Sequence, residues 1–531
     1  MIDDGPGEVG DGSTRGGGRR VSRRTVLQGA VAAGLASGVA AAFPAAARAA
    51  VPGVAREWET FDGAVRGAFR RLGMVGSSVA VVSAEEVLYT STHGVRDRAT
   101  WEPVTNDTHF LVASTTKSMS SLLVATYVDE GLLGWDQLVV DAWAGFRAPT
   151  DELTTTLKVR DLLGMATGID EPSALSGMHE GVPTAAQLLQ SVVNLPVSHP
   201  PNQSFFYNNT VYAVGGYLPA LAQGVALEDL EAAYVEQMGE RVFGPVGMAT
   251  ATIADDPRGV VPNYAVGYGP DLRGRPTRLP YGPVGSYAPV GGTLASLIDM
   301  TAYVRLQLRQ GTSINGDAVV SAANLAECHR RHIDSQYSPD LDPDVTASGY
   351  AMGWINQTYV DGTSLVWHNG GIDGFTTFIG FFPERDLGLV VLNSMNPVNV
   401  GVLFYTAVLD ALVAERFGLN EGVGEKVVTL YDQTIDGLGQ TWDASRPVDR
   451  AAVAPFLGEY QNSYRLAFAG DELQVTNGPR VMSVRAMPDG TYVLSGGLLL
   501  GTPLQLTRGP DGSSRMELVG VERVQRTVGL G

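Results

Sequence analysis

The stretch FLVASTTK, residues 110–117, carries the pattern on which the fold assignment depends. It contains Ser-x-x-Lys, from Ser114 to Lys117, at the start of a helix that the apolar spacing predicts over residues 114–131. Residues i and i+3 share a helix face, so the hydroxyl and the amine can meet. A serine hydroxyl needs a base to become a nucleophile, and a partly desolvated lysine can be that base. By itself, the motif also fits a capping serine followed by a surface lysine.

The basic residues of the chain are almost all arginines. Only Lys117, Lys158 and Lys426 are lysines among 37 basic residues. An amine can lose its proton, whereas a guanidinium cannot. The lysine in the Ser-x-x-Lys motif is therefore more informative than a lysine usually is.

Two further motifs follow Ser114 in order. The segment YNN, residues 207–209, lies between apolar neighbours, and HNGG, residues 368–371, closes a β run. With APVGG at 288–292, the chain over about residues 60–415 resembles the penicillin-binding-protein and class C β-lactamase family. The segments VRDLLGMATG and NGGIDGF, residues 159–168 and 369–375, are also similar to this family.

The resemblance implies roles for six residues. Ser114 would attack the acyl carbon, while Lys117 and Tyr207 would share proton transfer, with Tyr207 serving the leaving group. Asn209 would hydrogen-bond Lys117 and an amide of the substrate. The backbone N–H groups of Ser114 and Gly371 would form the oxyanion hole.

The sixth residue, His368, marks a departure from the family pattern. It lies on the strand that lines the substrate site, where lactamases typically carry Lys-Thr-Gly and this chain has HNG, residues 368–370. A lysine there is a permanent cation, whereas a histidine is mostly neutral at pH 7. Some DD-carboxypeptidases and esterases of the family use His-x-Gly, so the departure disfavours lactamase activity.

The element pattern predicts an α/β fold, with one sheet built from both ends of a domain. A hairpin is expected at 78–90, helices in the middle of the chain, strands at 363–392 and a helix at 402–416. The family implies helices on both faces of this sheet and a helical subdomain beside it, as in β-lactamases and transpeptidases.

Four segments are expected along the chain. Residues 1–49 form a disordered extension with a signal peptide, and residues 50–419 form the catalytic domain. A linker rich in Gly and acidic residues spans 420–452. Alternating runs with Gly turns over 453–531 predict an antiparallel β module, a small lipocalin-like barrel. Because the motifs are complete by Gly371, we expect acyl-enzyme formation not to require this module.

The N-terminus resembles a twin-arginine (Tat) signal peptide. Arg23-Arg24 precedes a weakly apolar run, and Ala47-Arg48-Ala49 offers a small-x-small cleavage site. This pattern predicts a secreted or cell-envelope protein that leaves the membrane after cleavage. A retained anchor and the absence of export are the alternatives.

Charge and composition restrict the partners. A net charge of −19 repels nucleic acid and anionic membranes, which leaves a small-molecule or peptide substrate as the expected partner. Cys328 is the one cysteine, so no internal disulfide forms. The sequence gives no signal for the oligomeric state.

Two metal-like spacings are interpreted as structural. Cys328-His329-x-x-His332 has no third ligand pattern nearby, and Asp340-x-Asp342-x-Asp344 lacks the glycine and glutamate that a calcium loop needs. We therefore expect neither a metal nor another cofactor.

The leading hypothesis is an exported serine hydrolase that forms an acyl-enzyme on Ser114. D-amino-acid peptidase (DD-carboxypeptidase or D-aminopeptidase) and esterase chemistry ranks ahead of β-lactam hydrolysis. An acyltransferase or peptide cyclase on the same fold, and a non-catalytic penicillin-binding-like module, are the alternatives.

Overall fold

A nine-stranded antiparallel sheet organises the larger part of the chain. The computed structural model describes residues 56–171, 183–335, 342–396, 400–420, 422–497, 499–518 and 521–526. The strand order is β3-β2-β1-β14-β13-β12-β11-β10-β9. These strands are β1 (Gly76–Val82), β2 (Val87–Asp97), β3 (Glu102–Pro103), β9 (Ile333–Asp334), β10 (Val345–Tyr350), β11 (Ile355–Tyr359), β12 (Ser364–Ile372), β13 (Phe375–Phe382) and β14 (Leu387–Asn393). Because β1 lies between β2 and β14, the sheet is built from both ends of the domain, as predicted.

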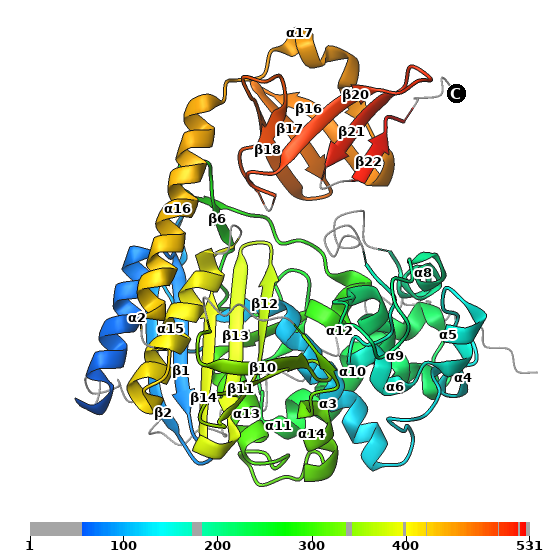
Figure 1. The fold of residues 1–531 in the computed structure, drawn as a ribbon, viewed down its shortest axis with the longest axis vertical. Coiled ribbons are helices and arrows are strands. Elements are labelled where there is room, and N and C mark those ends of the chain that lie inside the picture. The colour runs from blue at the N-terminus through cyan, green and yellow to red at the C-terminus, as the bar shows by residue number, and fades with distance from the viewer. Residues whose placement is uncertain are drawn as a thin grey trace, which may run out of the picture. The chain divides into compact units, whose positions relative to one another are not determined.

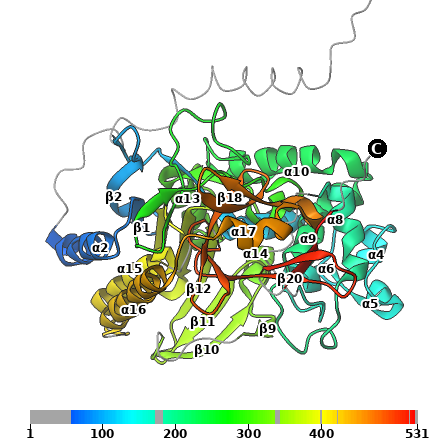
Figure 2. The same cartoon turned by 90° about the horizontal axis from the view of Figure 1, so that it is seen from above.

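Both faces of this sheet are covered by helices. Successive side chains of a strand point to opposite faces, and in β1 Val79 and Val81 belong to one apolar cluster, whereas Ala80 and Val82 belong to the other. The first cluster is shared with α2 (Glu59–Arg71), α15 (Val400–Phe417) and α16 (Val423–Ala444), which lie side by side in Figures 1 and 2. The second is shared with α3 (Thr116–Asp129) and α13 (Leu297–Leu308). The predicted sheet with two helical layers is confirmed.

A helical region extends the second layer. Its helices are α4 (Val139–Ala142), α5 (Asp151–Thr156), α6 (Val159–Leu163), α8 (Ala185–Ser191), α9 (Asn209–Ala222), α10 (Leu230–Met238), α11 (Gly244–Val246), α12 (Ala288–Gly291) and α14 (Ala322–His329). Side-chain oxygens of Thr150, Thr184, Asn208 and Ser321 cap the first turns of four of these helices. Two small sheets complete the region: β4 (His109–Leu111) with β8 (Thr293–Ser296) and β5 (Thr252–Ile253), and β6 (Tyr268–Pro270) with β7 (Pro276–Arg278).

The connection over 420–452 contains the 22-residue helix α16. Val423, Val427 and Leu438 are its buried residues, and the first two pack with α15 in the core beside the sheet. A short helix, α17 (Arg450–Val453), follows. The connection that Gly and acidic residues suggested as a linker is thus largely helical.

The C-terminal part is an antiparallel sheet that curls into a half-barrel (Figure 1). Its strands are β15 (Gly458–Glu459), β16 (Tyr464–Ala469), β17 (Glu472–Asn477), β18 (Arg480–Ala486), β19 (Tyr492–Leu494), β20 (Pro503–Arg508), β21 (Ser514–Leu518) and β22 (Val521–Val524). Alternate residues such as Leu473 and Val475 form a separate core inside it. Residues 54–531 nevertheless form one compact unit.

Among the described helices, none is by itself long and apolar enough to cross a membrane. Taken together, the segments 209–222 and 227–246 have the length and composition of a membrane span, but they are bent by 115° relative to each other.

Candidate active site

The nucleophile segment lies between strand β4 and helix α3. Strand β4 pairs with β8, and the N–H of Val112 donates to Thr293 O at 2.9 Å just before the turn. Ala113 then adopts φ +50°, a left-handed conformation that non-glycine residues rarely adopt. A short 3-10 turn, Ala113–Thr115, carries Ser114 into α3. The strained residue therefore lies directly before the predicted nucleophile, as is common at functional sites.

Ser114 and Lys117 meet as the helical spacing predicts. Lys117 Nζ lies 3.1 Å from Ser114 Oγ and also donates to Val290 O at 3.1 Å. Lys117 is fully buried, and burial lowers the pKa of its amine well below the ordinary value, although the charge of Glu171 acts in the opposite direction. A neutral amine next to a serine hydroxyl is able to accept its proton.

Tyr207 completes the proton-transfer group. Its ring centroid lies 4.8 Å from Lys117 Nζ. Burial raises the pKa of the Tyr207 phenol, while the side chain of Ser114 acts in the opposite direction. The phenol therefore keeps its proton at neutral pH and is suited to be a donor rather than a base.

Asn209 is the first residue of α9, and it makes a different contact from the one expected. Its backbone N–H and its side-chain amide donate to Glu171 Oε2 at 2.8 and 3.4 Å, and Oδ1 is buried without a hydrogen-bond partner. Among the described residues, the Asn209 side chain hydrogen-bonds Glu171 and not Lys117. Thr210 Oγ1 also donates to Glu171, at 2.7 Å.

Glu171 is a site residue that the sequence analysis missed. Its charge raises the pKa of Lys117, and its Oε2 accepts a hydrogen bond from the backbone N–H of Asn209 at the start of α9. No local motif or helical spacing connects it to Asn209, 38 positions later. Only the folded chain brings the carboxylate to this place.

His368 lies on β12 with its ring buried. Its Nδ1 lies 2.5 Å from Asn369 O, and its Nε2 lies 3.0 Å from the Tyr350 hydroxyl. A carbonyl only accepts, so Nδ1 carries the proton and Nε2 accepts from Tyr350. Burial lowers the pKa of His368 to about 3. The ring is thus a neutral part of the site wall, and Tyr350 is a second residue that the motifs did not reveal.

Gly370 allows β12 to lie against the nucleophile turn. A Cβ on Gly370 would lie 2.2 Å from Val112 O, which also accepts a hydrogen bond from Thr377 Oγ1 at 2.8 Å. Only glycine allows this approach. Gly371 is exposed, and its strand β12 contacts the 3-10 turn that holds Ser114. The two expected oxyanion donors therefore lie on segments in direct contact.

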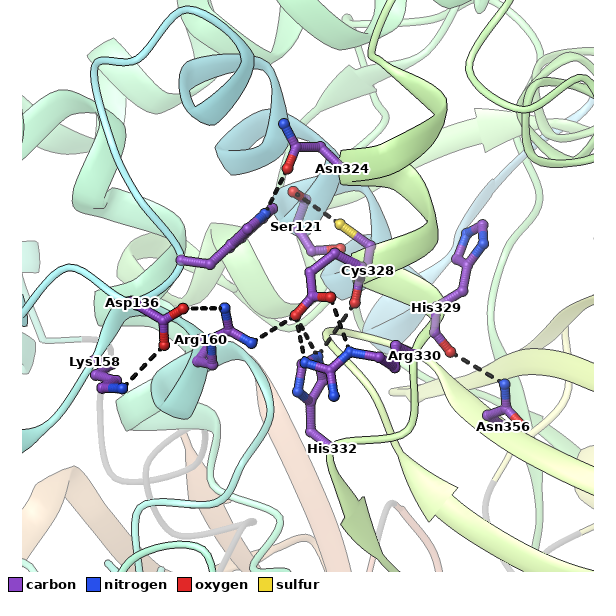
Figure 3. Close-up of polar contacts among 12 residues, drawn as sticks. Ser121, Asp136, Lys158, Arg160, Asn324, Cys328, His329, Arg330, His332 and Asn356 are labelled. Carbon is purple, nitrogen blue, oxygen red and sulfur yellow. Dashed lines mark hydrogen bonds and ion pairs between the residues drawn. The ribbon is translucent and has the colours of Figure 1, made fainter.

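The Cys328-His329-x-x-His332 spacing forms a polar network (Figure 3). Glu327 accepts from Arg160 and Arg330, and the Asn356 amide donates to His329 O. In Figure 3 the His332 ring lies beside Arg330, whereas the His329 ring points away. Within the described ranges, no group of three potential ligands could hold a metal ion. Asp340 of the second metal-like spacing lies outside those ranges.

Comparison with known proteins identifies a family and a fold to which the chain is similar. A family model described as Beta-lactamase matches residues 61–411. Unguisins hydrolase ungD' of Aspergillus campestris is 26% identical over 428 residues, covering 76% of this chain and 75% of that protein. Penicillin-binding protein 4 of Amycolatopsis lactamdurans is 24% identical over 392 residues, covering 73% and 93%. The octameric penicillin-binding protein homologue from Pyrococcus abyssi has a similar fold, with a TM-score of 0.57, 18% identity and coverage of 88% and 99%.

Proposed function

Because this chain belongs to the beta-lactamase family of serine hydrolases, we propose that it forms an acyl-enzyme on Ser114 and cleaves an ester or amide. The proposed activity is that of a D-amino-acid peptidase or an esterase. The observation that carries the proposal is the 3.1 Å contact between Ser114 Oγ and a buried Lys117 whose pKa is strongly lowered.

Acylation follows from the protonation states of three side chains. The neutral Lys117 amine takes the proton of Ser114 as its Oγ bonds to the acyl carbon. The N–H groups of Ser114 and Gly371 stabilise the oxyanion that develops. Tyr207 gives its proton to the leaving group as the bond to the acyl carbon breaks, and the proton held on Lys117 restores the phenol.

Deacylation uses the same groups in the reverse direction. A water molecule attacks the acyl carbon, its proton passes to the Lys117–Tyr207 pair, and Ser114 Oγ regains a proton as the acid leaves. The name of the Aspergillus relative includes hydrolase, which supports water rather than an amine or alcohol as the acceptor.

The environment of His368 supports the substrate class. A lactamase-type substrate presents a free carboxylate, and a cation on this strand would bind it. His368 is neutral and its Nε2 is occupied by Tyr350. Esters and amides without a required carboxylate are therefore the better substrates.

Rates for one short p-nitrophenyl ester and one penicillin test this substrate class. We expect measurable ester hydrolysis and slow or negligible penicillin turnover. A kcat/KM for the penicillin that equals or exceeds that for the ester would restore β-lactam hydrolysis as the function.

We also propose export by the twin-arginine route, on the basis of Arg23-Arg24 and the run that ends at Ala49. Chain recovered outside the cytoplasm should begin near residue 50 by intact mass. An uncut chain that remains in the cytoplasm would contradict this.

A further inference from the structure

We propose that Arg480, in the C-terminal sheet, is a positioning residue for the oxyanion-binding end of β12, acting through Asp373. The proposal rests on the acyl-enzyme function proposed for Ser114. It assigns to the C-terminal sheet a part in the chemical step.

The two side chains form a buried ion pair. Arg480 Nε donates to Asp373 Oδ2 at 2.7 Å, and the two side chains are 8% and 3% exposed. Arg480 is the first residue of β18, whereas Asp373 directly follows β12, two positions after Gly371. The pair therefore joins the C-terminal sheet to the turn at the end of the site strand.

Neighbouring backbone encloses this pair tightly. A Cβ on Gly282 would lie 2.2 Å from Asp373 Oδ2 and 2.3 Å from Arg480 Nη2. On the other side of the turn, Gly374 has φ +79°, and a Cβ there would lie 2.4 Å from Gly267 Cα. Backbone therefore restricts Asp373 at Gly282 and restricts its turn at Gly374, while a small cavity lined by Asp373, Arg480 and Leu279 lies beside the pair.

Arg480 stabilises an otherwise poorly compensated carboxylate. Burial raises the pKa of Asp373, the charge of Arg480 acts in the opposite direction, and Asp373 Oδ1 is buried without a hydrogen-bond partner. Removal of the guanidinium would leave a buried carboxyl that must protonate or turn toward water. The second response displaces the β12–β13 turn.

The C-terminal sheet has a second attachment that does not involve the pair. The Trp442 ring of α16 lies between the guanidinium groups of Arg273 and Arg485, with Cζ atoms 3.6 and 3.8 Å from the ring centroid. Leu438 and Leu272 pack with Val493 and Leu500 of the C-terminal part beside it. Loss of the Arg480 side chain should therefore leave the sheet attached, so a variant tests the ion pair rather than docking.

An oxyanion contact exists in the transition state and not in the ground state. Loss of one such donor lowers kcat by about 10²–10³, and a displaced donor should lower it by part of that range. We expect Arg480→Gln to lower kcat for a p-nitrophenyl ester by about 10-fold or more, with KM changed by less than about 2-fold. This differs from the expectation that the C-terminal module is dispensable for acylation.

The experiment compares full-length variants by steady-state kinetics and thermal melting. Arg480→Gln with Asp373→Asn removes both charges together and should recover most of kcat, because no charge stays buried alone. The matched control is Arg523→Gln, since Arg523 is a buried arginine of the same sheet that packs on Tyr464 and bonds Leu518 O. It should lower Tm while leaving kcat within about 2-fold. Arg480→Lys, which keeps the charge, should retain more activity than Arg480→Gln.

The outcomes separate the two proposals. An unmodified chain that hydrolyses no ester and takes up no fluorophosphonate overturns the acyl-enzyme function, and the role of Arg480 with it. If the unmodified chain is active, unchanged kcat in Arg480→Gln overturns the positioning role alone. Equal losses in Arg480→Gln and Arg523→Gln, or no recovery in the double variant, would also overturn it. If Arg480→Gln does not fold, the Arg480→Lys and double variants decide by the same comparison with Arg523→Gln.

Discussion

Replacement of Lys117 by arginine separates the two roles that an amine can have beside Ser114, namely a base and a fixed positive charge. Arginine keeps the charge but cannot lose its proton at working pH. If Lys117 acts as the base, its loss should cost the whole contribution of proton transfer, which is typically about 10²–10⁴ in rate.

Two features of the structure support a loss of rate within the range of about 10²–10⁴. The amine contacts Ser114 Oγ directly at 3.1 Å, and its pKa is lowered by burial rather than by an exposed neighbour. A guanidinium is also larger than an ammonium group, and the ring centroids of Tyr207 and Tyr212 lie 4.8 and 5.8 Å from Nζ. We expect kcat/KM to fall about 10³-fold, equivalent to about 4 kcal/mol of barrier.

The assay measures kcat/KM for a short p-nitrophenyl ester from pH 5 to 9, with folding checked by circular dichroism. Lys158→Arg is the matched control, because that amine is exposed and paired with Asp136 at 3.0 Å. Its activity should stay within about 2-fold, since surface substitutions change stability by about 0.5 kcal/mol or less. In the unmodified chain, the rate should fall as pH decreases through the lowered pKa of Lys117. Near-normal turnover by Lys117→Arg would refute the assignment of the base.

Three further predictions concern the site wall. Tyr207→Phe should lower amide hydrolysis by about 10²–10³ and p-nitrophenyl ester hydrolysis far less, because nitrophenolate leaves without a proton; equal losses would argue against a donor role. The pKa of His368 is about 3 in the folded chain and about 6.5 in the unfolded chain. As the pH falls below about 6.5, the unfolded chain therefore binds a proton that the folded chain does not bind. This difference lowers the free energy of unfolding by about 2 kcal/mol at pH 5. His368→Gln should therefore lose less stability between pH 7.5 and 5 in urea titrations than the unmodified chain; identical losses would contradict a neutral buried ring. Gly370→Ala should abolish most turnover, because the added Cβ would lie 2.2 Å from Val112 O. The control Gly424→Ala in α16 should be neutral in the same assay, because its Cβ would meet no atom within 4 Å. Normal activity of Gly370→Ala would contradict the close approach of β12.

Local patterns in the sequence predicted the parts of the site that depend on neighbouring residues. The Ser114–Lys117 contact follows from helical spacing, and the hairpin around residues 84–86 follows from strand alternation and a turn. One sheet built from both ends of the domain was also predicted, and the pairing of β1 with β14 provides the junction.

Features that depend on distant contacts or on burial were not predictable in the same way. Glu171 comes near Lys117 only in the folded chain, and the lowered pKa of His368 depends on the burial of its ring. Helix α16 was hidden by its glycines and acidic residues, because α15 supplies the surface that makes it stable. The Arg480–Asp373 pair joins residues 107 positions apart, and although Asp373 belongs to the segment NGGIDGF, no motif includes Arg480.

The most direct test of the central claim is intact-mass spectrometry of the full chain after incubation with a fluorophosphonate. We predict one phosphonyl adduct on the unmodified chain, with peptide mapping to Ser114, and no adduct on Ser114→Ala. The matched variant Ser118→Ala, which changes a buried serine one turn along α3, should still be labelled. Equal labelling of Ser114→Ala and the unmodified chain would contradict the account, because the nucleophile would then be another residue.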